Sequence, residues 1–276
     1  MEEKRKHHRG RRKRKGSVLS NVILVVAVAV FIFSAYKLIS IYSEYHKGDK
    51  EYDNIVEDAV EIQTPQEEEA EKGEEEQKLK IHASLKVNFD KLKKTNKDIV
   101  GWIQFDEPEK INYPVVRGTD NDKYLTTTFE GKKNSSGAIF MDAINTGDFS
   151  DRNTFIYGHN MKNGSMFGQL RKFKTKDYYE QNPYFYIYTP DGKEVKYQIF
   201  AVCIVEDTSR SYTRFYNSDE EYLDYLKYVK SIARYDTGVE VTAESKIVSL
   251  STCTNVSETQ RLLVHGVKIS EAVVGE

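Results

Sequence analysis

Two short apolar runs near the end of the chain have the composition of β-strands, and each has a chemically functional side chain at one end. The first, Ile247-Val248-Ser249-Leu250-Ser251-Thr252-Cys253, ends on a cysteine. The second begins eight residues after that cysteine, as Arg261-Leu262-Leu263-Val264-His265-Gly266-Val267. Runs of this length, rich in β-branched and apolar residues, predict strands. The two predicted strands therefore bring a thiol and a guanidinium to strand ends.

Similar strand candidates recur upstream, at residues 99–103, 113–116, 137–141, 153–157, 184–189 and 195–205. The sequence Pro190-Asp191-Gly192-Lys193 predicts a hairpin between the last two. Apolar residues at helical spacing predict helices over 85–92, over 166–173 and from Ser218, where Glu221 completes a capping box. Many short strands with few helices favour a mostly β fold, a barrel or a sandwich, over a parallel α/β sheet.

The N-terminal part has a different composition. The net charge of −2 over 276 residues conceals a basic block before residue 16 and an acidic block over 51–76. Between them, residues 18–39 hold about 20 uncharged residues before Lys37, enough to cross roughly 30 Å of hydrocarbon as a helix. A cleaved signal peptide is the alternative, but its apolar core is usually only about 7–15 residues and Ser34-Ala35 is a poor cleavage site. An uncleaved anchor is favoured.

The flanking charges predict the orientation of this anchor. Lys and Arg before the span keep that side in the cytoplasm, and the same cluster beside a membrane favours lipid contact over nucleic acid. The acidic stretch contains too little apolar material for a core. The sequence therefore predicts a single-pass cell-membrane protein with a basic cytoplasmic tail (1–16), a transmembrane anchor (17–40), an acidic stalk or linker (41–80) and an extracellular catalytic domain (81–276).

The two cysteines differ in their surroundings. In an extracytoplasmic domain they could form a disulfide. Cys203, however, lies in the almost wholly apolar run 197–205, which favours a buried free thiol, whereas Cys253 has polar neighbours. We therefore interpret Cys203 as structural and Cys253 as reactive.

Cys253, His159 and Arg261 together can perform acyl transfer. A thiolate is the nucleophile, an imidazole moves protons, and a guanidinium faces developing negative charge. Each residue has a structural alternative: a small buried hydrophobe, a turn histidine and a solvated strand end, respectively. Asn160, Ser251 and Thr252 beside them are candidate substrate-binding residues, and His265 is interpreted as a hydrogen-bonded core residue. Neither a zinc-ligand spacing nor a glycine-rich phosphate loop is present, so no metal or cofactor is predicted.

These residues resemble a known family. Ser249-Leu250-Ser251-Thr252-Cys253 is similar to the Thr-Leu-x-Thr-Cys signature of sortases, with Ser in first place, and His159 and Arg261 match the family's histidine and arginine. Residues 97–103, 111–116 and 137–142 resemble class B sortases in particular, so the resemblance runs from about residue 81 to the C-terminus. Glu258 is the acidic residue between Cys253 and Arg261, and we interpret it as a solvated loop carboxylate.

The resemblance implies a membrane-anchored transpeptidase of Gram-positive bacteria with a closed β-barrel of about eight strands and a few peripheral helices. It implies that Cys253 attacks a threonine carbonyl in a sorting signal of the Asn-Pro-x-Thr-x type and forms a thioester. His159 would protonate the departing amine and Arg261 would steady the oxyanion. An amine from peptidoglycan or its lipid-linked precursor would release the product. A cysteine hydrolase of cell-surface peptides and a non-enzymatic tethered binding domain remain as alternatives.

Overall fold

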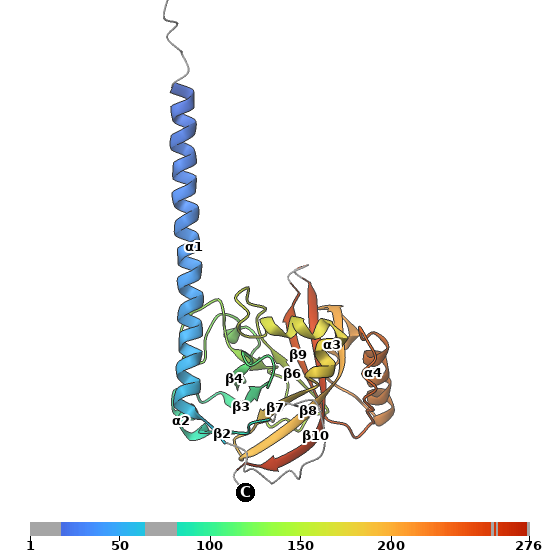
Figure 1. The fold of residues 1–276 in the computed structure, drawn as a ribbon. Coiled ribbons are helices and arrows are strands. Elements are labelled where there is room, and N and C mark those ends of the chain that lie inside the picture. The colour runs from blue at the N-terminus through green and yellow to red at the C-terminus, as the bar shows by residue number, and fades with distance from the viewer. Residues whose placement is uncertain (1–17, 64–81, 255–256, 258, 275–276) are drawn as a thin grey trace, which may run out of the picture. The chain divides into compact units, whose positions relative to one another are not determined.

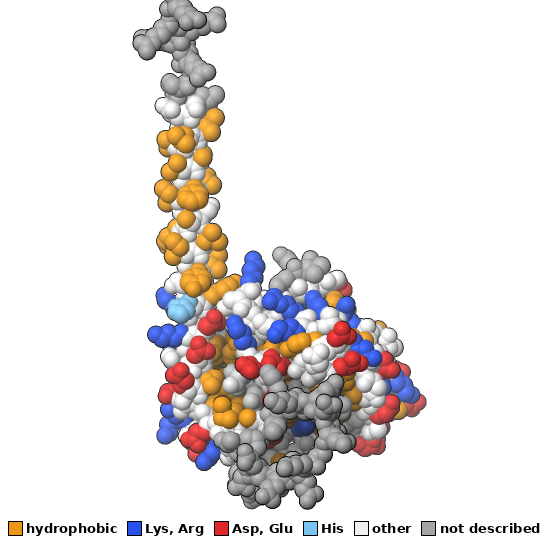
Figure 2. Space-filling view, in the orientation of Figure 1, with side chains coloured by type: hydrophobic (Ala, Val, Ile, Leu, Met, Phe, Trp, Pro, Cys, Tyr) orange, Lys and Arg blue, Asp and Glu red, His pale blue; other side chains and the backbone are white. Residues whose placement is uncertain are grey.

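The computed structural model describes residues 18–63, 82–254, 257 and 259–274 (Figure 1). The chain divides into two compact units, Met1–Glu44 and Tyr45–Glu276. Helix α1 (Val18–Ala59) supplies the described part of the first unit and the start of the second. It is the one helix among the described residues that is long and apolar enough to cross a membrane. Figure 2 shows the apolar side chains that cover its N-terminal part.

The second unit is built on a closed barrel of eight strands, which confirms the predicted fold class. Around the barrel the strands follow the order β10-β8-β7-β3-β4-β5-β6-β9. Their bounds are β3 (Ile99–Gln104), β4 (Asn112–Val116), β5 (Ile139–Met141), β6 (Asn153–Tyr157), β7 (Tyr184–Tyr188), β8 (Lys193–Glu206), β9 (Ile247–Cys253) and β10 (Gln260–Val273). A separate two-stranded sheet pairs β1 (Val60–Ile62) with β2 (Leu85–Val87).

Two of the barrel pairings are parallel, β4 with β5 and β6 with β9. A parallel pair needs a long crossover connection. The connection between β6 and β9 contains β7, β8 and helix α4 (Asp219–Ser231), so β9 returns to lie beside a strand far from it in sequence. This crossover places the C-terminal ends of β6 and β9 side by side.

The helices only partly follow the sequence prediction. Ser218 caps α4 as predicted, with its Oγ accepting a bond from the Glu221 amide. The single helix predicted over 85–92 is instead strand β2 followed by the short helix α2 (Phe89–Thr95). The helix predicted over 166–173 is a 3₁₀ segment, η2 (Gly168–Lys174), followed by α3 (Lys176–Gln181). Two further 3₁₀ turns are η1 (Lys123–Leu125) and η3 (Arg210–Tyr212).

The folded part begins earlier than residue 81, where the sequence analysis starts it. Residues 45–59 of α1 belong to the second unit, and Tyr52, Ile55 and Ala59 join its main core. These residues lie within the segment expected to be an acidic stalk. An apolar face at helical spacing is enough to pack a helix even when its other face is strongly charged.

Both faces of the sheet around β9 and β10 are covered. Leu250, Leu262 and Val264 belong to the main core, whereas Leu263 belongs to a second cluster that α4 completes with its buried Tyr222. Side chains alternate between the two faces along a strand. The face that carries Leu263 is therefore the face of its cross-strand neighbour Ser251 and, two residues further on, of Cys253.

Candidate active site

Three neighbouring strand ends bring the predicted catalytic residues together. In the parallel pair, Tyr157 at the end of β6 lies beside Ser251 of β9, and the Gly158 amide donates to the Ser251 carbonyl at 3.2 Å. His159 and Cys253 each follow this pair by two residues. Arg261 of β10 lies directly opposite Cys253. The order β6-β9-β10 thus gathers His159, Cys253 and Arg261 at one end of the barrel.

Cys253 and Arg261 share one face of the sheet. Residues directly opposite each other in an antiparallel pair have Cβ atoms about 4.5–5.5 Å apart on the same face. The Cys253 carbonyl accepts a hydrogen bond of 2.7 Å from the Asn160 side-chain amide. Asn160, predicted to bind substrate, therefore fastens the main chain of Cys253 to the segment that carries His159.

His159 is held by a main-chain carbonyl from outside the three strands. Its Nε2 lies 2.7 Å from the carbonyl oxygen of Leu125, the last residue of η1. A carbonyl oxygen only accepts, so this bond requires the proton on Nε2. The main chain before the ring is tightly packed, because a Cβ on Gly158 would lie 2.5 Å from Ile139 Cδ1 and 2.8 Å from the Phe167 ring.

Arg261 is partly buried and held by a carboxylate. Its Nη2 donates to Asp207 Oδ2 at 3.2 Å, and its Nη1 donates to the Gln260 carbonyl at 3.2 Å. Asp207 follows β8, the other neighbour of β10, and its amide donates to the Thr259 carbonyl. Asp207 was not among the residues predicted from the sequence. Its signal was weak: one acidic residue after an apolar strand, with no pattern linking it to Arg261.

Ser251 and Thr252 point to opposite faces of β9. Ser251 Oγ lies 2.8 Å from the Tyr212 hydroxyl and lines the groove described below. Thr252 is buried on the face away from Cys253, and its Oγ1 has no hydrogen-bond partner within the part of the chain that the structure describes. Of this pair, Ser251 alone lines the groove.

A groove of about 320 Å³ opens beside these strand ends. Residues that line it include Leu125, Tyr157, Tyr212, Arg214, Ser251 and Arg261. The groove therefore extends from Leu125, whose carbonyl binds His159, to Arg261, which lies opposite Cys253. Of the three predicted catalytic residues, Arg261 alone lines this groove.

A buried ion pair stiffens one wall of this groove. Asp142 Oδ2 accepts bonds from the Tyr157 hydroxyl at 2.8 Å and from Arg214 Nε at 2.6 Å, and Arg214 Nη2 donates to the same hydroxyl at 3.0 Å. Burial alone would raise the pKa of Asp142. Hydrogen bonds from the Ile144 amide, Tyr157 and Asn121, with the charge of Arg214, hold it below its usual range. Tyr157 and Arg214 thus face the groove from fixed positions.

The two thiols differ as the sequence predicted. Both are free, Cys203 buried and Cys253 partly exposed. Burial raises the pKa of Cys203 to about 12, so this thiol stays protonated at neutral pH. Cys253 is therefore the thiol that can meet an incoming peptide.

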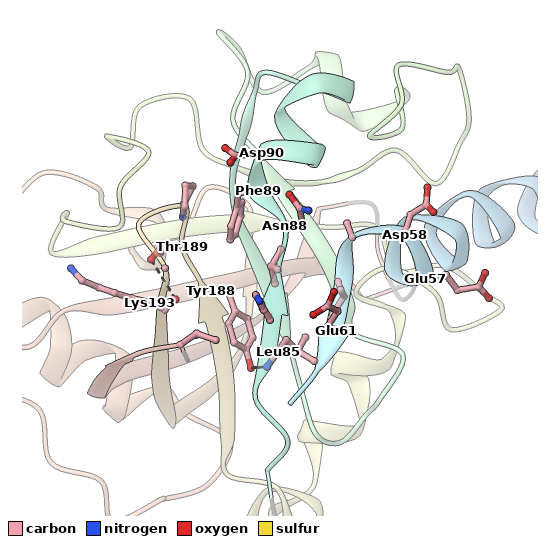
Figure 3. Close-up of a pocket in the computed structure, with 17 residues that line it drawn as sticks. Glu57, Asp58, Glu61, Leu85, Asn88, Phe89, Asp90, Tyr188, Thr189 and Lys193 are labelled. Atoms are coloured by element: carbon pink, nitrogen blue, oxygen red, sulfur yellow. Dashed lines mark hydrogen bonds between the residues drawn. The ribbon is translucent and has the colours of Figure 1, made fainter. Parts of the chain in front are cut away.

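A larger cavity of about 510 Å³ lies at the far end of β8 and β10 (Figure 3). Tyr188, Thr189 and Lys193 of the β7–β8 hairpin line it, together with the C-terminal end of α1 and the start of α2. Lys193 pairs with Val273, at the opposite end of β10 from Arg261. None of the predicted site residues lines it. Within the described ranges, no group of three His, Cys, Asp or Glu residues could hold a metal ion.

Comparisons with known proteins agree with this geometry. A family model described as the sortase domain matches residues 107–269. Sortase B of Listeria monocytogenes is 33% identical over 256 residues, covering 91% of this chain and 96% of that protein. The crystal structure of sortase B from B. anthracis in complex with AAEK1 is 30% identical, with a TM-score of 0.66 over 83% of this chain and 100% of that one. A Staphylococcus aureus sortase B–substrate complex is 31% identical, with a TM-score of 0.61 over 68% and 86%.

Proposed function

This chain belongs to the sortase family as a class B sortase, and we propose that it joins sorting-signal peptides to amines through a thioester on Cys253. Sortases are cysteine transpeptidases, and the class B enzymes act on surface proteins. The residue roles, the bond cleaved, the acceptor and the membrane location of this chain are our proposals. The observation that carries them is the meeting of three strand ends beside a groove.

The first half-reaction forms the acyl-enzyme. The Cys253 thiolate attacks the threonine carbonyl of the peptide, and the oxyanion that forms is stabilised by the Arg261 guanidinium. The carbon–nitrogen bond then breaks, the protonated His159 gives its proton to the departing amine, and a thioester remains on Cys253. Because Nε2 of His159 is bonded to Leu125, we assign this proton transfer to Nδ1. Asp207 keeps the Arg261 fork aimed at the groove.

The second half-reaction transfers the acyl group. An amine attacks the thioester, neutral His159 accepts a proton from it, and the carbon–sulfur bond breaks to return the thiolate. The acceptor we propose is an amine of peptidoglycan or of its lipid-linked precursor. The donor is a sorting signal of the Asn-Pro-x-Thr-x type, bound in the groove that Ser251 and Tyr157 line.

The apolar part of α1 supports a location at the cell membrane. We propose that this part spans the bilayer as the anchor at residues 17–40, with the basic tail (1–16) in the cytoplasm and the catalytic domain outside. That orientation delivers the groove to the side where surface proteins and cell-wall amines meet. Because residues 45–59 belong to the second unit, the acidic stalk is shorter than the expected 41–80.

The proposal is tested by trapping the thioester. The full-length protein in detergent is mixed with an Asn-Pro-x-Thr-x peptide library, with and without an oligoglycine or diaminopimelate amine, and intact and digested masses are recorded. We expect an acyl adduct on Cys253 that the amine discharges into a new amide. Cys253→Ala should form no adduct, whereas the matched variant Cys203→Ala should form it normally. An adduct on Cys203, or products that never contain the amine, would contradict the proposal.

The same assay tests Arg261. We expect Arg261→Lys to lose at least about tenfold in acylation rate, because an ammonium is a point charge and cannot reproduce the planar fork that reaches both Asp207 and the oxyanion. The rate is measured in single turnover, with the peptide in excess. Wild-type acylation in this variant would remove Arg261 from the mechanism.

A further inference from the structure

The second half of α1 packs beneath the two loops that flank His159. Gly48, Tyr52, Ile55 and Ala59 are buried at helical spacing. This half of α1 contacts two segments: residues 126–137, which follow η1, through its buried face, and the turn 159–168, which begins at His159 itself, through Asp49. The loop after η1 leads back to Leu125, whose carbonyl binds the imidazole.

Tyr52 fastens the first of these segments at two points. Its hydroxyl donates to the Gly137 carbonyl at 2.7 Å and accepts from the Phe129 amide at 3.3 Å. The ring is 4% exposed, so these bonds are shielded from water. The Tyr52 side chain therefore connects Phe129 to Gly137 within the segment 126–137.

Gly137, which Tyr52 binds, lies against Leu125, the hydrogen-bond partner of His159. Its φ is +57°, and a Cβ there would lie 2.3 Å from the Tyr124 carbonyl oxygen and 2.8 Å from the Leu125 carbonyl oxygen. The Gly137 main chain is therefore in close contact with the carbonyl that receives His159 Nε2. A shift of Gly137 displaces that acceptor directly.

Glu51, the residue before Tyr52, supports the tip of the same loop. Its Oε1 accepts from the Glu130 amide at 3.1 Å, and its Oε2 lies 3.4 Å from Lys132 Nζ. The carboxylate is 4% exposed. A buried carboxylate is costly unless it is satisfied, so this contact fixes the loop against the helix.

Asp49 fastens the second segment. Its Oδ2 accepts a bond of 2.8 Å from the Asn163 side-chain amide. Asn163 Oδ1 in turn accepts from the amide and the hydroxyl of Ser165, which organises the turn that follows His159. The Phe167 amide closes this turn by donating to the His159 carbonyl at 3.0 Å.

We propose that Tyr52 and Asp49 are positioning residues for His159, which makes the second half of α1 part of the catalytic apparatus. Tyr52 sets the acceptor of the ring through Gly137 and Leu125, and Asp49 sets the main chain of the histidine through Asn163. Neither residue lines the groove beside the strand ends. The inference rests on the proposed role of His159 in proton transfer.

The test compares Tyr52→Phe with a matched control. Tyr222 is equally buried, and its hydroxyl lies 2.8 Å from the Arg152 carbonyl and 2.9 Å from the Ser245 carbonyl, before the starts of β6 and β9 and so far from His159. Full-length wild type, Tyr52→Phe, Asp49→Ala and Tyr222→Phe are assayed in detergent with the Asn-Pro-x-Thr-x library. The readouts are kcat, KM, the pH profile of kcat and the NMR chemical shifts of the His159 ring.

We expect Tyr52→Phe and Asp49→Ala to lower kcat on the order of ten- to hundredfold with KM little changed, since small displacements of catalytic groups carry costs of this size. We also expect the NMR chemical shifts of the His159 ring to change in both. Tyr222→Phe should lower the melting temperature comparably and leave kcat and these chemical shifts unchanged. A Tyr52→Phe protein with wild-type kcat and wild-type His159 ring chemical shifts would overturn the inference.

His159→Ala separates this inference from the proposed function. Full activity in His159→Ala would remove the proton-transfer role itself. An inactive His159→Ala beside a wild-type-like Tyr52→Phe would leave the proposed function in place and reject only the role of α1.

Discussion

The two cysteines show how surroundings decide the chemistry of a side chain. Cys203 lies beneath α4, with its Sγ 3.6 Å from the Val229 carbonyl, and burial raises the pKa of its thiol to about 12. Cys253 ends an otherwise buried strand at a partly exposed position. This difference was predictable because each residue's sequence neighbours, apolar in one case and polar in the other, also surround it in space.

Other residues of the site were not predictable in this way. Asp207 and Leu125 act on Arg261 and His159 through contacts across 54 and 34 positions of sequence. The Leu125 contact uses a main-chain carbonyl, which every residue possesses. Residue type therefore carries no signal for it, and only the folded chain reveals it.

His265 gives a prediction about stability and pH. It is fully buried in β10, with Nδ1 2.8 Å from Ser249 Oγ, and burial lowers the pKa of its ring to about 3. The unfolded chain takes up this proton near pH 6.5 and the folded protein does not. Stability should therefore fall as the pH drops from about 6.5 toward 3, by up to about 1.4 kcal/mol per pH unit from this residue. Urea unfolding between pH 7.5 and 4.5 measures the slope.

His82 has a pKa shifted in the opposite direction to that of His265, and the two rings can be compared in the same samples. Burial alone would lower the pKa of His82, but Asp106 and Glu194 on either side raise it to about 9. Its contribution to stability is full below about pH 6.5 and is lost only as the pH rises through 9. Ring NMR should therefore show His82 charged and His265 neutral at pH 6. A His265 ring that titrates near 6.5 in the folded protein would contradict the expectation.

At the scale of elements, the strands followed their local sequences and the short helices did not. Continuous runs of β-branched and aromatic residues strongly favour a strand over other local structures. In contrast, Leu85, Phe89 and Leu92 fit a helical period, yet Leu85 pairs in β2 with Ile62. The second half of α1 was missed because its acidic side chains outweighed the apolar face, although Gly48, Tyr52, Ile55 and Ala59 recur at helical spacing.

The start of α4 gives a prediction at this scale. Ser218 Oγ accepts from the Glu221 amide at 3.1 Å, and Glu221 Oε2 accepts from the Asn217 amide at 2.8 Å. Ser218→Ala removes the first of these bonds and should lower the free energy of unfolding by about 1 kcal/mol. Urea unfolding measures the change, and Ser231→Ala, at the other end of the helix, is the control. Equal stability of Ser218→Ala and wild type would show that the cap contributes nothing.

For the whole molecule, the fold class followed from the count and composition of the strands, but the pairing order did not. The parallel contact of β6 with β9 joins segments separated by two strands and two α-helices. Such pairing depends on the closure of the barrel, and a local pattern cannot specify it. The resemblance of Ser249–Cys253, His159 and Arg261 to sortases indicated a candidate site without any geometry, because three residue types in a fixed order are specific where each alone is weak.

The N-terminal helix gives a prediction for the whole protein. We expect the full-length chain to stay in the membrane fraction after an alkaline carbonate wash, since about 20 apolar residues of α1 match the hydrocarbon thickness. A variant lacking residues 20–39 should be released. N-terminal sequencing of the mature protein separates an anchor from a signal peptide: a chain that starts after Ala35 would contradict the anchor.

The position of β10 in the barrel has a consequence for biogenesis. Of the described strands it comes last along the chain, and it closes the ring by pairing with both β8 and β9. Until β10 has been synthesised and has paired, Cys253 lacks the neighbour that lies opposite it, and the barrel stays open. We therefore expect thioester formation on Cys253 to require a nascent chain that already includes β10.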